Sequence, residues 1–185
     1  MGRYTLKVGR GESYGGAIVD SLMAGKPTKF LLDGMCGKLA RWLRILGFDA
    51  SYLKDAEDED LLKAAKEEAR VLVTRDVELY RKALKLGLSV ILISGASVVD
   101  GLSEFLKVVE AEPIVNIERS RCPNCNGALT KTGREDVAGR VPPRTYSVYR
   151  EYWVCGGCGK VYWLGSHWRN ITKILNDVKA KLKGN

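Results

Sequence analysis

Long apolar runs are the first thing that this sequence lacks. No stretch approaches the roughly 20 consecutive apolar residues that a membrane-spanning helix needs. The first residues, MGRYTLKVGRGESYGG, also lack the apolar segment of a secretory signal. Apolar residues nevertheless make up 45% of the chain, enough to bury a core, which argues against global disorder. We therefore expect a soluble, cytoplasmic protein with no membrane partner.

Positive charge is concentrated at one end of the chain. The formal net charge is +8 over 185 residues. Residues 119–185 carry 13 basic and 4 acidic side chains, whereas residues 30–118 carry 12 basic and 16 acidic ones. This asymmetry is typical of a protein that binds a polyanion mainly through its C-terminal part. The alternative is a basic surface that serves solubility alone.

Between residues 29 and 118, short apolar runs alternate with segments of helical periodicity. The alternation predicts an α/β domain, a mostly parallel sheet flanked by helices, whose strands are buried on both faces. The expected strands span residues 29–33, 49–53, 71–74, 89–94 and 113–118. The expected helices span residues 37–47, 58–69, 77–87 and 96–109.

The chain divides into three segments on this pattern. Residues 1–28 form an N-terminal extension without an assigned role, although residues 4–8 are compatible with a strand and residues 16–24 with a short helix. Residues 29–118 form the α/β domain. Residues 119–185 hold two cysteine pairs and end in an amphipathic helix. That helix has apolar residues at Ile171, Ile174, Leu175, Val178 and Leu182, and outward lysines at Lys173, Lys179, Lys181 and Lys183.

Acidic residues follow three of the predicted elements. Asp33 ends the first strand, Asp76 follows VLVT, and Asp58, with Glu59 and Asp60, opens the helix after the second strand. Ligands of open parallel sheets bind outside the carboxyl ends of the strands, so these acids are expected to converge at one edge.

Converging carboxylates repel one another unless a cation neutralises them. Oxygen ligands of this kind suit Mg²⁺ or Mn²⁺, which can activate water for attack on a phosphoryl group. The simpler alternative is that Asp58 and Asp76 are helix N-caps, a common role for aspartate. Capping does not account for Asp33 at the end of a buried strand.

Basic side chains accompany the acids. Lys38, Arg41 and Arg44 recur along the helix after Asp33, and Arg75 precedes Asp76. They are candidates for binding substrate phosphates. The alternative is the solvated face of a surface helix, which we expect for Arg44.

Five cysteines are present, and four of them occur as two C-x₂-C pairs. The pairs CPNC and CGGC predict a structural Zn²⁺ site with four thiolate ligands, which leaves no open position for a catalytic water. The zinc ligands would be Cys122, Cys125, Cys155 and Cys158. The fifth cysteine, Cys36, is expected to be a small buried thiol.

Aromatic residues gather after the second cysteine pair, in YWLGSHW. Trp163, His167 and Trp168, together with Tyr162, are candidates for stacking on unpaired bases. An equally good interpretation is that they form the small core of the cysteine-bearing unit.

Several of these stretches occur together and in order in a known family. FLLDGMCGKLARWLRILGFDASYL, DEDLLKAAKEEARVLVTRD, the pairs CPNC and CGGC, and VYWLGSHW resemble the Mut-seven C-terminal (Mut7-C) RNase family. That family joins a PIN-like nuclease domain to a zinc ribbon. The resemblance runs from Lys29 to about Asn170 and implies a metal-dependent ribonuclease.

The resemblance also implies roles for the acids. Asp33, Asp58 and Asp76 would bind the catalytic metal, with Asp60 as a further catalytic candidate in the same acidic run. Many PIN nucleases carry one more glutamate on a helix, and Glu78 is the candidate here.

We therefore expect a divalent-metal-dependent ribonuclease that hydrolyses RNA phosphodiester bonds with an activated water. Lys38 and Arg41 would orient phosphate, and the ribbon and tail would supply affinity. The main alternative is an RNA- or ribosome-binding adaptor whose PIN-like domain is catalytically idle. A nuclease of rRNA maturation differs only in its substrate, and the fused ribbon argues against a PIN toxin.

Overall fold

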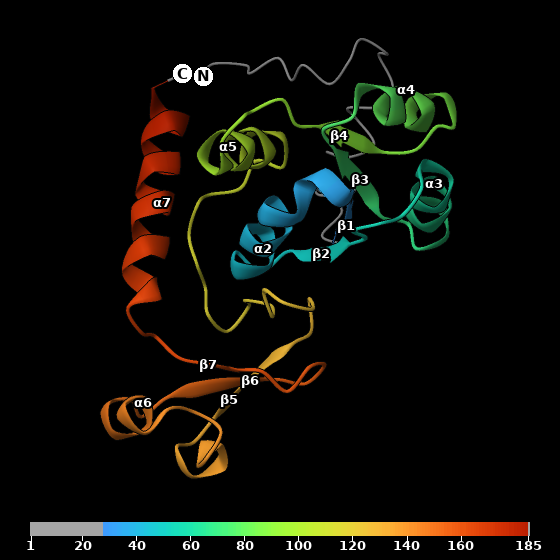
Figure 1. Cartoon of the computed structure of the whole chain (residues 1–185). Coiled ribbons are helices and arrows are strands. Elements are labelled where there is room, and N and C mark those ends of the chain that lie inside the picture. The colour runs from blue at the N-terminus through green and yellow to red at the C-terminus, as the bar shows by residue number, and fades with distance from the viewer. Residues whose placement is uncertain (1–27, 185) are drawn as a thin grey trace.

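The computed structural model describes residues 28–184 (Figure 1). Its first part is a parallel four-stranded sheet with the strand order β2-β1-β3-β4. The strands are β1 (Lys29–Leu32), β2 (Asp49–Tyr52), β3 (Val71–Thr74) and β4 (Val90–Leu92). All residues of β3 are buried, as expected of an inner strand covered on both faces. The predicted α/β architecture is confirmed; the strand and helix considered before residue 28 lie outside the described residues.

Helices cover both faces of the sheet because successive side chains of a strand point to opposite sides. Phe30 and Leu32 face α2 (Gly37–Ile45) and α5 (Val98–Val108), whereas Leu31 faces α3 (Asp58–Glu67) and α4 (Val77–Lys85). Figure 1 shows the two helix layers on either side of the strands. Among residues 28–184, no helix has the length and apolarity to cross a bilayer.

Local signals set several helix ends. Gly47, directly after the last turn of α2, has φ +95°, a left-handed conformation that ends a helix at little cost in glycine. Helix α5 begins with a capping box in which Ser97 and Asp100 bond to each other's backbone N–H groups.

The strand predicted over residues 113–118 is wrong. In the structure this segment forms no strand and runs from α5 towards the C-terminal sheet. Pro113 has no N–H to offer a neighbouring strand. Two apolar side chains of the segment are used in packing instead, since Val115 contacts the core formed by α2 and α5 and Ile117 lines a groove against the C-terminal sheet, whereas Ile114 is exposed.

Residues 121–165, called the ribbon below, form a small antiparallel sheet of order β5-β6-β7. Its strands are β5 (Leu129–Thr132), β6 (Tyr152–Cys155) and β7 (Val161–Tyr162), and the insert between β5 and β6 holds the short helices η2 (Glu135–Val137) and α6 (Pro143–Val148). Val137, Val141 and Tyr152 form a separate buried cluster there. The ribbon thus has a core of its own, away from the large sheet.

The C-terminal helix α7 (His167–Lys183) leaves the ribbon and returns to the α/β part. It packs along α5, and its Leu175 and Val178 are buried in the same core as Phe30. Lys181 forms an ion pair with Asp100 of α5. The exposed lysines Lys173, Lys179 and Lys183 confirm the prediction of a packing helix with a basic outer face.

Arg44 joins the ribbon to the α/β part, and its predicted position on a solvated helix face is wrong. Its side chain is 5% exposed. Nε donates to the carbonyl of Ala50 at 2.8 Å, and Nη1 donates to the carbonyls of Pro123 and Asn124, both at 3.1 Å. The residue is therefore a buried link between α2, β2 and the first cysteine pair.

A second link uses Asn126, which follows the first cysteine pair and has φ +67°. Its Oδ1 accepts from the backbone N–H of Ala50 at 3.1 Å, and its Nδ2 donates to Asp49 at 2.9 Å. Asp49 also pairs with Arg70 at 2.8 Å and Arg121 at 3.2 Å. Because Asp49 and Ala50 begin β2, the ribbon is attached at the amino edge of the parallel sheet.

Candidate active site and metal centre

Asp33 lies at the opposite, carboxyl edge, directly after β1. Strands β2 and β3 lie on either side of β1, so the strand order reverses its direction at β1. Open α/β sheets bind ligands at such a position. The side chain is 4% exposed and holds hydrogen bonds at both oxygens. Oδ1 accepts from the backbone of Met35 at 2.9 Å, and Oδ2 accepts from the Thr74 hydroxyl and from the Arg75 backbone at 3.2 Å.

Asp76 is joined to Asp33 through Thr74. The Thr74 hydroxyl, fully buried at the end of β3, donates to Asp33 and accepts from the backbone N–H of Asp76 at 2.9 Å. Asp76 also caps α4, since its Oδ1 accepts from the N–H groups of Glu78 at 2.6 Å and Leu79 at 3.2 Å. Capping therefore explains one oxygen of Asp76 and leaves Oδ2 for another ligand.

Asp58 occupies the first turn of α3, where Glu57 rather than Asp58 is the N-cap residue. The N-cap alternative therefore holds for Asp76 and fails for Asp58. Asp58 pairs instead with Lys82 of α4 at 2.8 Å. Asp60, two residues further on in α3, is exposed, as is Glu78 in the first turn of α4.

The Thr74 hydroxyl binds the Asp33 carboxylate and the backbone N–H of Asp76, so the structure places these two residues side by side at the strand ends, and it places Asp58 on α3. It does not gather the three carboxylates tightly. Among residues 28–184, the four cysteines have ligand atoms that all lie within 4.8 Å of one another. No group of three carboxylates in that part of the chain meets the same criterion. Lys82 holds the Asp58 carboxylate with a positive charge, in the role that a cation would otherwise fill.

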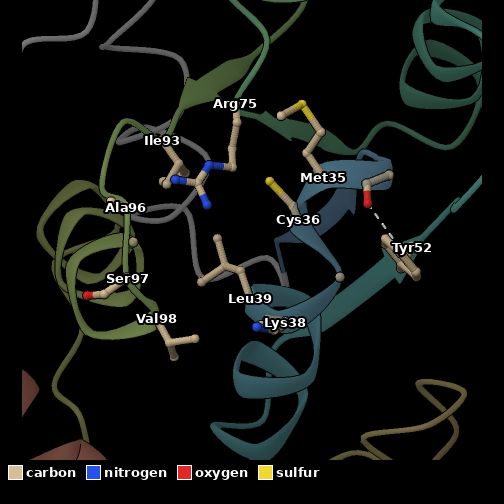
Figure 2. Close-up of a pocket in the computed structure, with 13 residues that line it drawn as sticks. Met35, Cys36, Lys38, Leu39, Tyr52, Arg75, Ile93, Ala96, Ser97 and Val98 are labelled. Carbon is tan, nitrogen blue, oxygen red and sulfur yellow. Dashed lines mark hydrogen bonds between the residues drawn. The ribbon is translucent and has the colours of Figure 1, made fainter.

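A cleft of about 500 Å³ opens between the start of α2 and the start of α5, lined by Gly34, which follows Asp33, and by Arg75, which precedes Asp76; we call it the α2–α5 cleft. Lys38 and Arg75 line it, whereas Arg41 does not. Figure 2 shows Arg75 reaching from the end of β3 between Ile93 and the sulfur of Cys36.

Cys36 is 2% exposed, which confirms the expected buried thiol. Burial, together with the negative charge of nearby Asp33, raises the pKa of this thiol, so it stays protonated at neutral pH. Cys36 thus has the character of an unreactive packing residue at the floor of the cleft.

The second candidate site is the cysteine cluster of the ribbon. The sulfurs of Cys122 and Cys158 are 3.6 Å apart, and those of Cys125 and Cys155 are 3.4 Å apart. Four thiolates about 2.3 Å from a tetrahedral Zn²⁺ would lie roughly 3.8 Å from one another. The cluster therefore fits a tetrahedral metal ion such as zinc.

Hydrogen bonds from outside the cluster reach two of its sulfurs, those of Cys122 and Cys155. Amide groups of Gly157 and Cys158 point at the Cys155 sulfur, at 3.3 and 3.4 Å. Burial alone would raise the pKa of Cys122, but hydrogen bonds from Tyr162 and from nearby backbone amides bring it down to about 6. The Tyr162 hydroxyl lies 3.0 Å from that sulfur, and its burial and this hydrogen bond raise the pKa of the phenol. Tyr162 is thus a neighbour of the cluster rather than a free stacking surface.

The remaining aromatic candidates take different positions. Trp163 packs partly against the ribbon core, and Trp168 lines an apolar groove of about 120 Å³ between the ribbon and α7. His167 begins α7, is exposed, and does not belong to the cysteine cluster. Trp153, which the sequence analysis did not single out, is 7% exposed and lines the same groove.

Sequence reasoning missed Thr74, the residue that connects the two strand-end acids. The available signal was a hydroxyl residue closing an apolar strand two positions before an aspartate. A buried hydroxyl needs a hydrogen-bond partner, and at the end of an inner strand the nearest side chains are those at the end of the adjacent strand.

Comparison with known proteins places these features in one family. The family model described as Mut7-C RNAse domain matches residues 28–175. Searches of curated proteins and of solved structures give no match to this chain.

Proposed function

Because the chain belongs to the Mut7-C RNAse domain family, which indicates a nuclease-type function, we propose that it is a divalent-metal-dependent ribonuclease. One observation carries the finer part of this proposal. Asp33 and Asp76 are joined by Thr74 where β1 and β3 end side by side, at the position in the sheet where such folds bind ligands.

Asp33, Asp58 and Asp76 would hold Mg²⁺ or Mn²⁺, since their carboxylates have the oxygen chemistry that these ions prefer. Such an ion, when bound, lowers the pKa of a water and neutralises charge on phosphate. In the hydrolysis, a water oxygen would form a bond to phosphorus, the bond to the leaving oxygen would break, and a proton would pass to the leaving oxygen. Asp60, exposed on α3, offers an additional carboxylate.

The other side chains position the acids and the substrate. Thr74 donates to Asp33 and so fixes the orientation of a buried carboxylate. Lys82 neutralises Asp58 and must be displaced when a divalent ion binds there. Lys38, Arg41 and Arg75 would bind phosphates beside the scissile one.

The division of labour between the segments belongs to the same proposal. Residues 29–118 would hold the chemistry, and residues 119–185 would supply affinity for RNA through their excess of basic side chains. Cys122, Cys125, Cys155 and Cys158 would hold structural Zn²⁺, and Trp163, His167 and Trp168 would contact bases. Since the ribbon is attached at the amino edge, an RNA that uses both parts must extend along the α/β part.

The decisive variant is Asp76→Asn. Asparagine retains the Oδ1 that caps α4 but loses the charge that would bind the metal. We expect Mn²⁺-dependent cleavage of labelled single-stranded RNA to fall by more than about 100-fold, beyond the loss typical of residues that merely support metal ligands. Mn²⁺ affinity, measured by calorimetry, should fall with it.

The control is Glu67→Gln, which makes the same change of charge at an exposed position in the last turn of α3. Reactions with and without added Mn²⁺ are compared in metal-depleted buffer rather than in chelator, because a chelator would also strip the cysteine cluster. Parental activity and Mn²⁺ affinity in a folded Asp76→Asn protein would refute the metal site.

The adaptor alternative also has an observation in its favour, namely the ion pair that occupies Asp58 and the loose spacing of the carboxylates. It predicts RNA binding of the full chain with no cleavage under any divalent ion, and the same assay therefore decides between the two.

A further inference from the structure

The α2–α5 cleft has the size of a small-molecule site. Its volume of about 500 Å³ lies within the range of about 300–1,000 Å³ that ligand pockets occupy. It opens where β1, β3 and β4 end, and Arg75 connects it to the proposed catalytic acids because its backbone N–H donates to Asp33 at 3.2 Å. A ligand in the cleft would therefore lie close to Asp33.

The charged side chains that line the cleft are both cations, Lys38 and Arg75, and no carboxylate lines it. Arg75 is fixed in place by a hydrogen bond to the carbonyl of Gly95. A guanidinium has five N–H donors, and Figure 2 shows this one directed into the cleft, between Ile93 and Cys36. The first turn of α2, residues 37–39, also lines the cleft, and the N-terminus of a helix favours negative charge. The cleft is thus suited to an anionic group.

Part of the cleft wall is apolar, where Leu39, Ile93 and Val98 line it. Leu39 and Ile93 are 7% and 2% exposed, and Val98 of α5 stands on the far side. A hydrated inorganic anion gains nothing from such walls. A ligand with a flat, weakly polar part next to an anion gains from both the walls and the cations.

We propose that the α2–α5 cleft receives one unpaired nucleotide of the RNA, with its phosphate at Lys38 and Arg75 and its base against Leu39 and Val98. A pocket of this size accepts a single splayed nucleotide and not a base pair, so the substrate is single-stranded RNA or a single-stranded end. That the nucleotide belongs to an RNA substrate rests on the proposed nuclease function. Binding of a nucleotide in the cleft can be measured without cleavage.

The test uses the full chain with methyl-labelled Leu, Ile and Val, without Mg²⁺ or Mn²⁺, titrated with uridine 5′-monophosphate, uridine and inorganic phosphate. We expect the monophosphate to shift the methyl signals of Leu39, Ile93 and Val98 and to bind more tightly than either fragment. Lys38→Gln and Arg75→Gln should each weaken it about tenfold or more, as expected for loss of a charge-assisted hydrogen bond. Lys66→Gln, an exposed lysine in the last turn of α3, is the matched control.

The outcomes separate this proposal from the nuclease function. Nucleotide binding in the cleft without RNA cleavage supports the cleft and refutes the nuclease. Cleavage that depends on Asp76, with no methyl shift at Ile93 and Val98, refutes the cleft and retains the nuclease. Equal affinity for inorganic phosphate and the monophosphate, or duplex RNA cut as fast as single-stranded RNA, also overturns the nucleotide assignment.

Discussion

The two edges of the parallel sheet use charge in different ways. At the amino edge, Arg44 and Asp49 are mostly buried, and each holds several groups of the ribbon. At the carboxyl edge, the Asp58–Lys82 pair is partly exposed, and Lys38 is exposed at the mouth of a cleft. One edge joins two parts of the protein, whereas the other presents charge to solvent.

This contrast shows which charges are available for chemistry. A charge whose hydrogen-bonding groups are all used inside the protein stabilises the fold and cannot readily accept a ligand. Asp33 is the exception at the carboxyl edge. It is buried and accepts hydrogen bonds at both oxygens, although its neighbours there are the exposed Asp76 and the α2–α5 cleft. It combines a structural role with a position at the proposed site.

The largest expected effect is on the ribbon side. Cys155→Ser should abolish binding of the one zinc ion expected per chain and unfold the ribbon, because structural zinc contributes about 10–16 kcal/mol of apparent free energy in zinc-finger peptides. Zinc content by atomic absorption and amide exchange over residues 121–165 are the measurements. Cys36→Ser, the same change at a buried cysteine outside the cluster, should keep the zinc. A zinc-loaded Cys155→Ser protein would show that the cluster is not a four-cysteine site.

The next largest effect is expected for Arg44→Met, which tests the contact between the ribbon and the α/β part directly. Methionine fills much of the volume but leaves the carbonyls of Ala50, Pro123 and Asn124 without their donor. Loss of buried hydrogen-bond partners predicts a decrease of about 2–4 kcal/mol in the free energy of unfolding, measured in urea. Arg41→Met, on the exposed side of the same helix, should change it by less than about 0.5 kcal/mol. Equal effects of the two variants would mean that the amino edge is not held by Arg44.

Asp49 makes the stability of the contact between the ribbon and the α/β part depend on pH. Burial opposes ionisation, but hydrogen bonds from Arg70 and Asn126 outweigh it and lower the pKa of this carboxyl in the folded protein. Because the pKa is lower in the folded protein, the ionised carboxyl stabilises the fold at pH values above the unfolded pKa of about 3.9. This stabilisation is lost as the pH falls through the pKa of the folded protein. Asp49→Asn should therefore cost about 1–3 kcal/mol at pH 7. The difference from the parent, followed by urea unfolding, should shrink below about pH 4; a constant difference would contradict the pKa argument.

The smallest effect on stability is expected at the carboxyl edge, for Lys82→Gln. Its partner Asp58 is partly exposed, and exposed ion pairs contribute little to folding. The thermal midpoint should hardly move. Mn²⁺ should bind more tightly, because the competing positive charge at Asp58 is gone, and calorimetry measures this. Unchanged or weaker Mn²⁺ binding would exclude Asp58 from the metal site.

The fold was largely predictable because its signals are local. Apolar runs of four residues, helical spacing and Gly47 identified the strands and helices of the sheet, and the spacing of the cysteines identified the cluster. The error at residues 113–118 arose because the alternation of Val115 and Ile117 is also found in an irregular segment that packs on one side. Nothing local distinguishes a strand from an irregular segment lying on a core.

The candidate site was predictable only in part, because its partners come from distant segments. The position of Asp33 and Asp76 follows from the rule for parallel sheets, but the Thr74 link depends on the register of β1 against β3. Arg44 was misplaced because its spacing from Lys38 and Arg41 describes one helix, whereas its partners lie 79 and 80 residues away. Periodicity predicts which side of a helix a residue occupies and not what will cover that side.

Asn126 and Arg44 have a consequence for solubility. Strand β2 is at the edge of the sheet, and the N–H and C=O of Ala50 are bonded to the side chains of Asn126 and Arg44. An edge strand with unpaired backbone groups is a template on which a second molecule can add a strand, the first step of aggregation. Asn126 of the ribbon occupies the N–H of Ala50 and thereby protects this edge. Unfolding of the ribbon would therefore expose β2 to intermolecular strand pairing, and aggregation would follow from the loss of a blocking side chain rather than from unfolding of the core.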